Sequence, residues 1–580
     1  MGDRHKIQKS GSLKPVFEMR EKKEKMNMNM NRKQLAALLL AGTMSLSLSA
    51  CGGGEDAPAS GGEDTAAENH LKFGCYVYAN SFDPAGYQNS AWQGIRMNVT
   101  ECLFKFDDAM EVHNYLADSF EVSEDSKTWT FHIRDGVKFS NGRPCDAQAV
   151  ADSLNRLYNV CDREDGSYSS TPRKYLDVES ITADPEANTV TMVTVKGYAN
   201  VPATLCFPFY AIIDVEGDLE DASHDYSASL VGTGAYTLTS FDPTTKNFEL
   251  GQNPNYWGGE VPYDKISVMH IEDDTTKAIA LQAGDIDLTE NITSATDLEQ
   301  LMADPAYHVH RLAGMRTGFA YVNMAGVLGQ NEALRQAVMM ACDCQTMCDV
   351  TVGGMYTYGY AVLPSTLSYD YDSLNYQFGY NAEGAKKLLD DAGIVDTDGD
   401  GFRELNGEKL TLEYITYVNR CLSDFAEAVQ VYLAEVGIDV HITNTDSDTE
   451  WNLMQAGQYD LCDSNWTTVA TGDPTAFMLN WYGGVDGDNL YSADNAGGSN
   501  YCGYNNEAYN AAYKKFAASL DEAERADLVI EMEQLLLDDA AVLVHGYYNS
   551  SMISNVAKVQ NANIHTVDYY WLDNTVAPAQ

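Results

Sequence analysis

Hydrophobic residues recur at helix and strand spacings along the chain from about residue 71 to its end. In AVADSLNRLYN, Val150, Leu154 and Leu157 share one face of a predicted helix. In NAEGAKKLLDDAG, Asn381 is placed to cap a helix that stops at Gly393. Each predicted helix has one hydrophobic face, so the chain is expected to fold around buried cores.

A strand, a helix and a second strand follow one another between residues 410 and 442. LTLEYITY and IDVHI alternate as strands do, and hydrophobic residues between them repeat at helical spacing. That helix face consists of Leu422, Phe425, Val429, Leu433 and Val436, and Gly437 closes it. A β-α-β unit joins parallel strands, and both patterns span the whole body, so the predicted class is α/β.

The first 70 residues have a different pattern. Residues 35–50 are apolar or small and follow a basic flank, which is the layout of a secretory signal and is short for a membrane span. LSAC at 48–51 resembles the bacterial lipobox, which implies cleavage before Cys51 and lipid attachment to it. We expect a signal at 1–50 and a flexible acidic Gly/Ser tether at 51–70. An uncleaved anchor is the alternative.

The charge and the motifs of the chain argue against nucleic-acid binding and against several classes of enzyme. The chain has 37 basic and 85 acidic residues, a net charge of −48, which argues against binding to nucleic acid. The motifs HExxH, GxSxG and GxxxxGK[ST] are absent, which removes the usual support for three large enzyme classes. We expect a monomeric binding protein without enzymatic activity or cofactor.

Six stretches of the body match, in the same order, the segments of a known protein family. They are LADSFEVSEDSKTWTFHIRDGVKFSNGRPCDAQAVADSLNRL (116–157), VGTGAYTLTSF (231–241), QNPNYWGG (252–259), ALQAGDIDL (280–288), ALRQAVMMACD (333–343) and GAKKLLDDAGIVDTDGDGFRE (384–404). Together they resemble the family 5 extracytoplasmic solute-binding proteins, the peptide- and nickel-binding group of ABC transporters. The resemblance covers roughly residues 71–580.

This resemblance implies a two-lobed, periplasmic-binding-protein-like fold of type II, in the large peptide-binding class. The first lobe would be discontinuous, with residues 71–268 (including an extra subdomain) and a return segment at 544–580. The second lobe would be residues 269–543. A solute bound between the lobes would favour hinge closure.

The implied function is that of a lipid-anchored substrate-binding component of an ABC importer. It would act on the extracytoplasmic face of the bacterial membrane and deliver its solute to a permease and ATPase pair. An oligopeptide is the expected solute. An oligosaccharide, a metal complex, or a role as a sensor without transport are the alternatives.

The stretch SNWTTVATGDP at 464–474 resembles the cleft loop of the family. In the peptide binders a Trp there is followed three residues later by an Asp that receives the peptide ammonium. Here Trp466 is kept, but Val469 occupies the place of the acid. The residues of this loop expected to contact ligand are Asn465, Trp466, Thr467, Thr468 and Val469. Core packing is the alternative for Trp466.

Arg420 is the expected anchor for a ligand carboxylate. It follows a strand, basic residues are scarce, and the guanidinium fork matches a carboxylate. A surface ion pair is the alternative. Tyr417 precedes it, and Tyr78 and Asn80 lie in a stretch that resembles the loop entering the cleft.

The stretch DTDGDGFRE places Asp396, Asp398, Asp400 and Glu404 at positions 1, 3, 5 and 9 of an EF-hand-like loop. Position 12 is Gly407, so the bidentate ligand is missing. A structural calcium ion and a plain acidic turn are the two interpretations.

Overall fold

The computed structural model describes residues 69–580, except 87, 162, 164–166, 221–223, 368, 418, 493–494 and 496. The predicted signal, Cys51 and all but the last two residues of the predicted tether lie outside the described residues.

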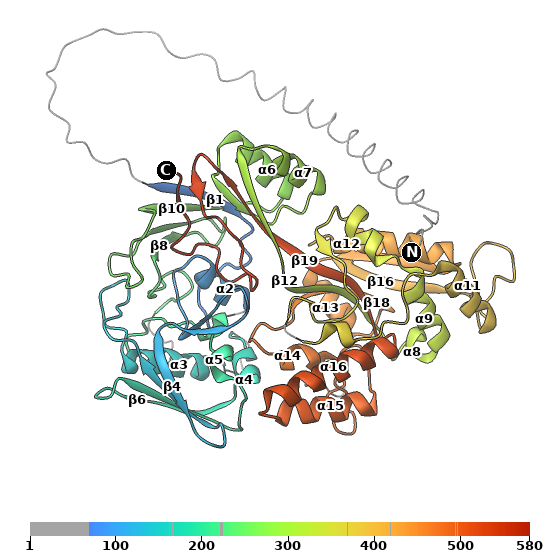
Figure 1. The fold of residues 1–580 in the computed structure, drawn as a ribbon, viewed down its shortest axis with the longest axis horizontal. Helices are drawn as coiled ribbons and strands as arrows, with labels where there is room; N and C mark the ends of the chain where they lie inside the picture. The colour runs from blue at the N-terminus through green and yellow to red at the C-terminus, as the bar shows by residue number, and fades with distance from the viewer. Residues whose placement is uncertain are drawn as a thin grey trace, which may run out of the picture. The chain divides into compact units, whose positions relative to one another are not determined.

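An eleven-stranded mixed sheet organises the fold, in the order β17-β16-β18-β12-β19-β11-β1-β10-β9-β8, with β13 paired to β19 (Figure 1). β1 is parallel to β10 and β11, and β16 is parallel to β17 and β18. The strands are β1 (His70–Cys75), β8 (Tyr236–Phe241), β9 (Phe248–Gln252), β10 (Lys265–His270), β11 (Leu288–Glu290), β12 (Tyr307–Val322), β13 (Tyr356–Thr357), β16 (Thr411–Tyr417), β17 (Asp439–Thr445), β18 (Leu461–Thr467) and β19 (Val542–Asn555).

Two long antiparallel strands, β12 and β19, connect the β1 end of the sheet to the β17 end (Figure 1). The first part of β12 pairs with the last part of β19, and the pairing register shifts between Ala313 and Thr317. Beyond that shift, β12 also pairs with β18. The chain therefore passes between the two ends of the sheet along β12 and β19, while β11 still pairs with β1. The predicted lobe limits, 268 and 543, stay predictions.

A separate four-stranded antiparallel sheet lies within residues 71–268, the segment for which an extra subdomain is predicted. Its order is β4-β5-β7-β6, and its strands are β4 (Ala117–Val122), β5 (Thr128–Ile133), β6 (Val178–Asp184) and β7 (Thr189–Thr194). Helix α3 (Ala147–Cys161) packs against β6 and β7. Val150, Leu154 and Leu157 are all buried on this helix, as their spacing predicts.

The predicted β-α-β unit is confirmed. β16 and β17 are parallel and in register from Thr411–Asp439 to Tyr417–Thr445, and α12 (Leu422–Glu435) lies between them in the sequence. Gly437 follows the helix with φ +83°, a left-handed conformation that favours glycine. The helix contacts β16, β17 and β18, so its hydrophobic face covers this end of the sheet.

The predicted helix after Asn381 is also confirmed. It is α11 (Ala382–Asp391), and the Asn381 side chain accepts a hydrogen bond from the backbone of Gly384. Gly393 follows with φ +76°.

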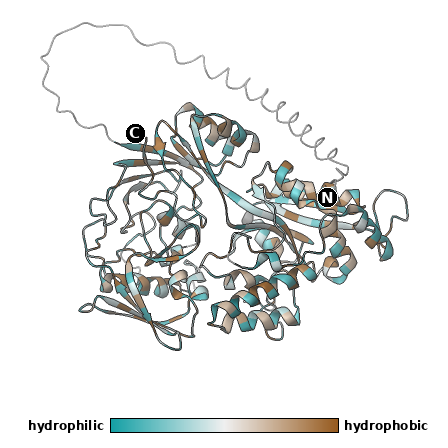
Figure 2. Ribbon diagram, viewed as in Figure 1, coloured by the Kyte–Doolittle hydropathy of each residue, from teal (hydrophilic) through white to brown (hydrophobic). Residues whose placement is uncertain are grey.

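The other helices flank the sheets, and Figure 2 shows hydrophobic and hydrophilic residues side by side on them. They are α2 (Gln88–Arg96), α4 (Thr171–Tyr175), α5 (Val201–Thr204), α6 (Asp274–Ala283), α7 (Ala295–Ala303), α8 (Val327–Gln330), α9 (Glu332–Ala341), α10 (Cys344–Thr346), α13 (Ser447–Gln455), α14 (Thr475–Met478), α15 (Glu507–Ala518) and α16 (Glu522–Asp538). Within the described residues no helix has the length and apolar character needed to cross a bilayer.

Several short elements complete the chain. Three two-stranded pairs are β2 (Phe104–Phe106) with β3 (Val112–Asn114), β14 (Glu404–Leu405) with β15 (Glu408–Lys409), and β20 (Val559–Gln560) with β21 (Ala577–Pro578). Single turns of 3₁₀ helix are η1 (Pro208–Tyr210), η3 (Tyr371–Ser373) and η4 (Leu479–Trp481), and η2 (Met347–Thr351) is a π-helix.

Candidate functional site: an arginine cluster between the two ends of the sheet

Arg420 lies between β16 and α12 in an unusual backbone conformation. Its φ is +47° and that of Cys421 is +59°, so two adjacent non-glycine residues are left-handed. Such backbone strain persists only where surrounding contacts hold it, and it is common at functional sites. The Tyr356 hydroxyl donates a hydrogen bond to the Arg420 carbonyl at 2.8 Å, which holds the turn in place.

The Arg420 side chain reaches the segment that follows β1. Its Nη2 donates to the Tyr78 hydroxyl at 3.2 Å. The guanidinium carbon also lies 5.7 Å from the Tyr78 ring centroid and 5.9 Å from that of Tyr548. The predicted residues Tyr78 and Arg420 are thus brought together from the β1 and β16 parts of the sheet.

Arg316 is the second arginine of the cluster. It lies on β12 and is buried, and its Nη1 donates to Asn465 Oδ1 on β18 at 3.3 Å. Its guanidinium carbon is 5.2 Å from the Trp92 ring centroid of α2. Burial and the nearby charge of Arg420 lower the pKa of Arg316 to about 10, so this side chain remains charged at neutral pH.

Arg96 of α2 is the third arginine, and it already has a carboxylate partner. Its Nη2 contacts Asp568 Oδ2 at 2.7 Å, and both side chains are buried. The guanidinium also lies over the rings of Trp571 and Trp92, at 4.2 and 4.6 Å. Asp568 therefore neutralises Arg96.

Arg316 and Arg420 have no carboxylate within ion-pair distance among the described residues. Two buried acids, Glu450 and Asp463, act electrostatically on Tyr417. Asp463 contacts His545 at 2.7 Å, and burial raises the pKa of Glu450 to about 9. Glu450 is therefore protonated at neutral pH. The carboxylate whose charge reaches both arginines is Asp568, which is already paired with Arg96, so Arg316 and Arg420 keep no ion-pair partner of their own among the described residues.

Three buried nitrogen donors in this region lack a hydrogen-bond partner among the described residues. They are Trp92 Nε1, Gln93 Nε2 and Arg316 Nε. A buried donor without an acceptor costs about 1–3 kcal/mol. Together with the two uncompensated charges, these donors make the cluster complementary to a ligand that carries an anion.

The cleft-loop residues divide between the two faces of β18. Asn465 is buried, accepts from Arg316, and donates from Nδ2 to the Tyr356 hydroxyl at 3.0 Å. Trp466 comes next in the strand, so it projects from the opposite face. It is half-buried, its Nε1 donates to Ser464 Oγ at 2.8 Å, and its ring lies 6.1 Å from that of Phe477.

The end of the loop is packed into the protein. Thr467 is half-buried, and its Oγ1 has no partner within the described part of the chain. Thr468 is buried and donates from Oγ1 to the Met315 carbonyl at 3.1 Å. Val469 is buried in the largest hydrophobic core. Asp473, four residues on, forms an ion pair with Arg525. The loop thus supplies no free carboxylate for a ligand ammonium.

Tyr417 and Asn80 lie at the edges of the cluster. Tyr417 ends β16 and is half-buried; burial raises the pKa of its hydroxyl, and the charges of Arg420 and Arg316 oppose that rise. Asn80 is exposed. The ligand-contact roles of the nine predicted residues stay predictions.

Sequence reasoning missed Arg316, Arg96, Trp92 and Gln93. The signal was present, because Arg316 interrupts a run of hydrophobic and small residues in AGMRTGFAYVN. A charge in a strand that pairs on both edges must be buried, and buried charges need a partner. The sequence alone does not show the strand pairing that places β12 next to α2 and next to the turn between β16 and α12.

The acidic loop brings the four predicted calcium ligands together. One oxygen from each of Asp396, Asp398, Asp400 and Glu404 lies within 4.8 Å of the others. Backbone hydrogen bonds also explain the arrangement: Asp396 accepts from Gly399 and Gly401, at 2.6 and 3.0 Å. A calcium ion at this loop stays a prediction.

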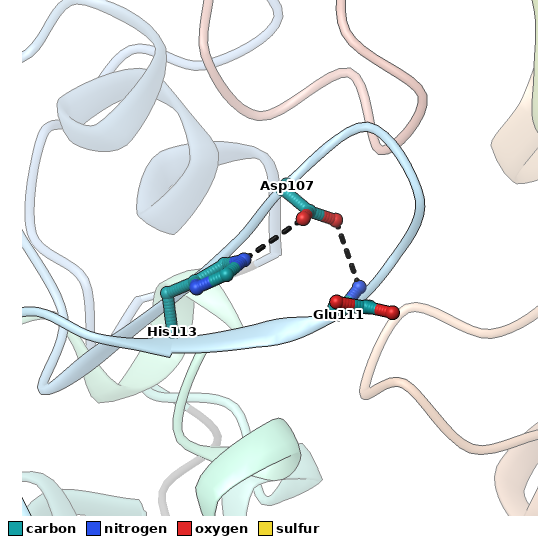
Figure 3. Close-up of side chains that lie close together, drawn as sticks. All are labelled: Asp107, Glu111 and His113. Atoms are coloured by element: carbon teal, nitrogen blue, oxygen red, sulfur yellow. Dashed lines mark hydrogen bonds and ion pairs between the residues drawn. The ribbon is translucent and has the colours of Figure 1, made fainter.

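A second group of this kind lies on the β2–β3 hairpin, which carries Asp107, Glu111 and His113 (Figure 3). Asp107 Oδ1 accepts from the backbone of Glu111 at 2.9 Å, and Oδ2 contacts His113 Nε2 at 2.8 Å. The hydrogen bond from His113 lowers the pKa of Asp107. These contacts close the hairpin and account for the group without an ion.

Comparison with known proteins decides the family. The family model for bacterial extracellular solute-binding proteins, family 5, middle region, matches residues 111–489, which is more than half of the chain. The chain belongs to family 5 of the bacterial extracellular solute-binding proteins. Members of this family bind solutes for transporters and are not enzymes, as the sequence predicted.

Two curated relatives cover most of this solute-binding protein. The nickel-binding periplasmic protein of Escherichia coli K12 is 29% identical over 392 residues, covering 66% of this chain and 72% of the relative. The dipeptide-binding protein DppE of Bacillus subtilis 168 is 26% identical over 576 residues, covering 93% and 99%.

Solved structures support the fold. NikA from Brucella suis, in complex with Fe(III)-EDTA, superposes with a TM-score of 0.77 at 23% identity, covering 88% of this chain and 99% of that one. The predicted fold, α/β with two lobes of the type II periplasmic-binding-protein kind, is therefore confirmed. The arginine cluster joins the β1 side of this solute-binding protein to the β16 side.

Proposed function

We propose that this solute-binding protein captures a small carboxylate-bearing solute between its lobes and delivers it to an ABC permease. The observation that carries the proposal is the pair of uncompensated arginines, Arg316 and Arg420. They lie beside unpartnered donors from α2, which belongs to the other side of the molecule. A short peptide, through its C-terminal carboxylate, is the first candidate.

A solute bound at the arginine cluster would favour closure of the two lobes, because both sides of the cluster would contact it. Arg420 contributes from the β16 side, and Tyr78, Trp92 and Gln93 contribute from the β1 side. A carboxylate held by both sides binds the closed arrangement more tightly than an open one. Differential affinity of this kind is what shifts a hinge equilibrium.

A metal complex with a carboxylate chelator is the second candidate. It is favoured by Val469, which is buried where the family's peptide binders carry an acid for the ligand ammonium. A ligand with several carboxylates and no free ammonium would use the arginines without needing that acid. The relatives include a nickel-binding protein and a dipeptide-binding protein, so both ligand chemistries occur among them.

The remaining parts of the proposal concern location and partners. Lipid attachment at Cys51 would anchor the mature chain at the extracytoplasmic face, with residues 51–70 as its tether. The solute would pass to a permease and ATPase pair, and the binding protein would act as a monomer. The lipobox resemblance and family membership support these statements.

The test is a thermal-shift panel on the full mature protein. It contains trialanine, trialaninamide, citrate, Ni(II) with and without L-histidine, and cellotriose. A ligand that binds only the folded state raises its melting temperature by mass action. We expect a shift from a solute with free carboxylates. A shift from cellotriose alone would contradict the carboxylate proposal, and no change with trialanine alongside a shift with Ni(II)-histidine would select the metal complex.

A further inference from the structure

A second pocket, whose lining shares no residue with the arginine cluster, lies where the end of α9 meets the tyrosine-rich segment after β13. Its volume is about 120 Å³. Its walls include Tyr358, Tyr360, Tyr376, Tyr380, Asp343 and Cys344. The Tyr-rich stretch of 355–380 provides four phenol rings around this pocket. None of these four belongs to the arginine cluster.

The rings divide into walls and mouth. Tyr360 and Tyr376 are half-buried and stack on each other, with centroids 5.2 Å apart and an interplanar angle of 1°. Tyr358 and Tyr380 are 37% and 43% exposed, so they stand at the opening. Tyr380 is braced by Tyr432, 5.8 Å away. The pocket is therefore open to solvent and bounded by aromatic surface.

The surroundings of the pocket are acidic. No Lys, Arg or His is among the described residues that line it. Burial, Cys344 and Asp343 raise the pKa of Tyr358 to about 12, and burial with Glu435 and Asp343 raises that of Tyr380. In the arginine cluster, by contrast, two guanidinium groups oppose the rise for Tyr417. A cation is the ion that this pocket favours.

Asp343 supplies a fixed negative charge. Its Oδ1 accepts from the backbone of Thr346 at 3.0 Å and its Oδ2 from the Thr346 hydroxyl at 2.7 Å, so the carboxylate is held at the start of α10. The thiols of Cys342 and Cys344 are neutral, because burial raises the pKa of both well above the physiological range. The described groups with metal-ligand spacing do not include these cysteines.

We propose that this pocket binds a small organic cation of the alkylammonium class, held by the tyrosine rings and by the charge of Asp343. Aromatic rings attract ammonium groups through their electron-rich faces, most strongly when the ion is desolvated. The volume of about 120 Å³ is well above the roughly 10–15 Å³ that a cavity needs to hold one water, so the pocket has room for a small organic group. The proposal does not depend on which solute the arginine cluster binds.

The experiment titrates the full mature protein with choline and, separately, with its neutral isostere 3,3-dimethylbutan-1-ol, by calorimetry. We expect choline to bind and the alcohol to bind at least about tenfold more weakly, because the two differ in charge but not in shape. Equal affinities, or no choline binding at millimolar concentration, would overturn the proposal.

Two variants and a control locate the site. Tyr358→Leu removes a ring from the mouth, and Asp343→Asn removes the charge while an amide oxygen can still cap the helix. Each is expected to weaken choline binding about tenfold. Tyr491→Leu removes a tyrosine that packs on Tyr501 elsewhere, and it should leave choline binding unchanged. If choline binding persists in both pocket variants, the cation binds elsewhere and the assignment is wrong.

Discussion

Arg420 donates a hydrogen bond to the hydroxyl of Tyr78 at 3.2 Å, across 342 positions of sequence. The contact joins the turn after β16 to the segment after β1. With Arg316 and the donors of α2 it defines one polar cluster, to which both sides of the sheet contribute.

Arg316→Gln is expected to weaken solute binding by about 10- to 100-fold, since hydrogen bonds to charged groups contribute about 1.5–3 kcal/mol. The same change should not lower the melting temperature of the unliganded protein, because Arg316 is buried near two other arginines. Calorimetry and thermal unfolding measure the two effects. Arg173→Gln, a charge change at a surface ion pair, is the control. Unchanged affinity in Arg316→Gln would remove Arg316 from the site.

Trp466→Ala separates ligand contact from packing. The indole lies on the opposite face of β18 from Asn465 and packs near Phe477, so we expect a lower melting temperature. Affinity should fall less than in Arg316→Gln. A large loss of affinity at unchanged melting temperature would instead make Trp466 a direct ligand contact, as the family resemblance implies.

Glu533 makes stability depend on pH. Its carboxyl is buried and accepts from the backbone of Leu363 at 2.9 Å, and burial raises its pKa to about 8 from the ordinary value of 4.5. The folded state therefore holds a proton that the unfolded state releases above its own pKa. The resulting stability is full below about pH 4.5 and is lost as pH rises to about 8.

Glu533→Gln should remove this contribution. The difference in unfolding free energy between variant and wild type is expected to change by up to about 1.4 kcal/mol per pH unit across that window. Urea unfolding at a series of pH values measures it. A difference that is constant with pH would show that Glu533 does not titrate between the two states.

Cys51→Ser tests the lipid anchor. If the chain is cut before Cys51 and acylated there, the wild type should partition into detergent and the variant should not. Phase partitioning and mass spectrometry of the mature N-terminus measure this. A wild-type protein with an unmodified cysteine would contradict the lipoprotein proposal.

Local patterns predicted local structure well. The Asn381 cap and the buried face of α3 each depend on residues a few turns apart, and the β16–α12–β17 unit is contained in residues 411–445. Their periodicity and capping chemistry act locally, so one sequence suffices to find them.

The site was only partly predictable. Arg420 is predicted from its position after a strand and from the scarcity of basic residues, and Tyr78 from a resemblance to the family; the structure brings the two together. Arg316 and Trp92 were missed because their proximity depends on β12 lying between β18 and β19 in the sheet, a long-range pairing with no local signature. Thr468 and Val469 are buried, and the Thr468 hydroxyl donates to the Met315 carbonyl; their predicted contact with ligand stays a prediction.

The most direct test of the carboxylate-capture account is a pair of calorimetric titrations of the wild-type protein. One uses the panel solute that raises the melting temperature most, and the other uses the same solute with its carboxylates converted to amides. The amide should bind at least about tenfold more weakly, because it cannot satisfy two uncompensated guanidinium charges. Equal affinity for the acid and the amide would contradict the account.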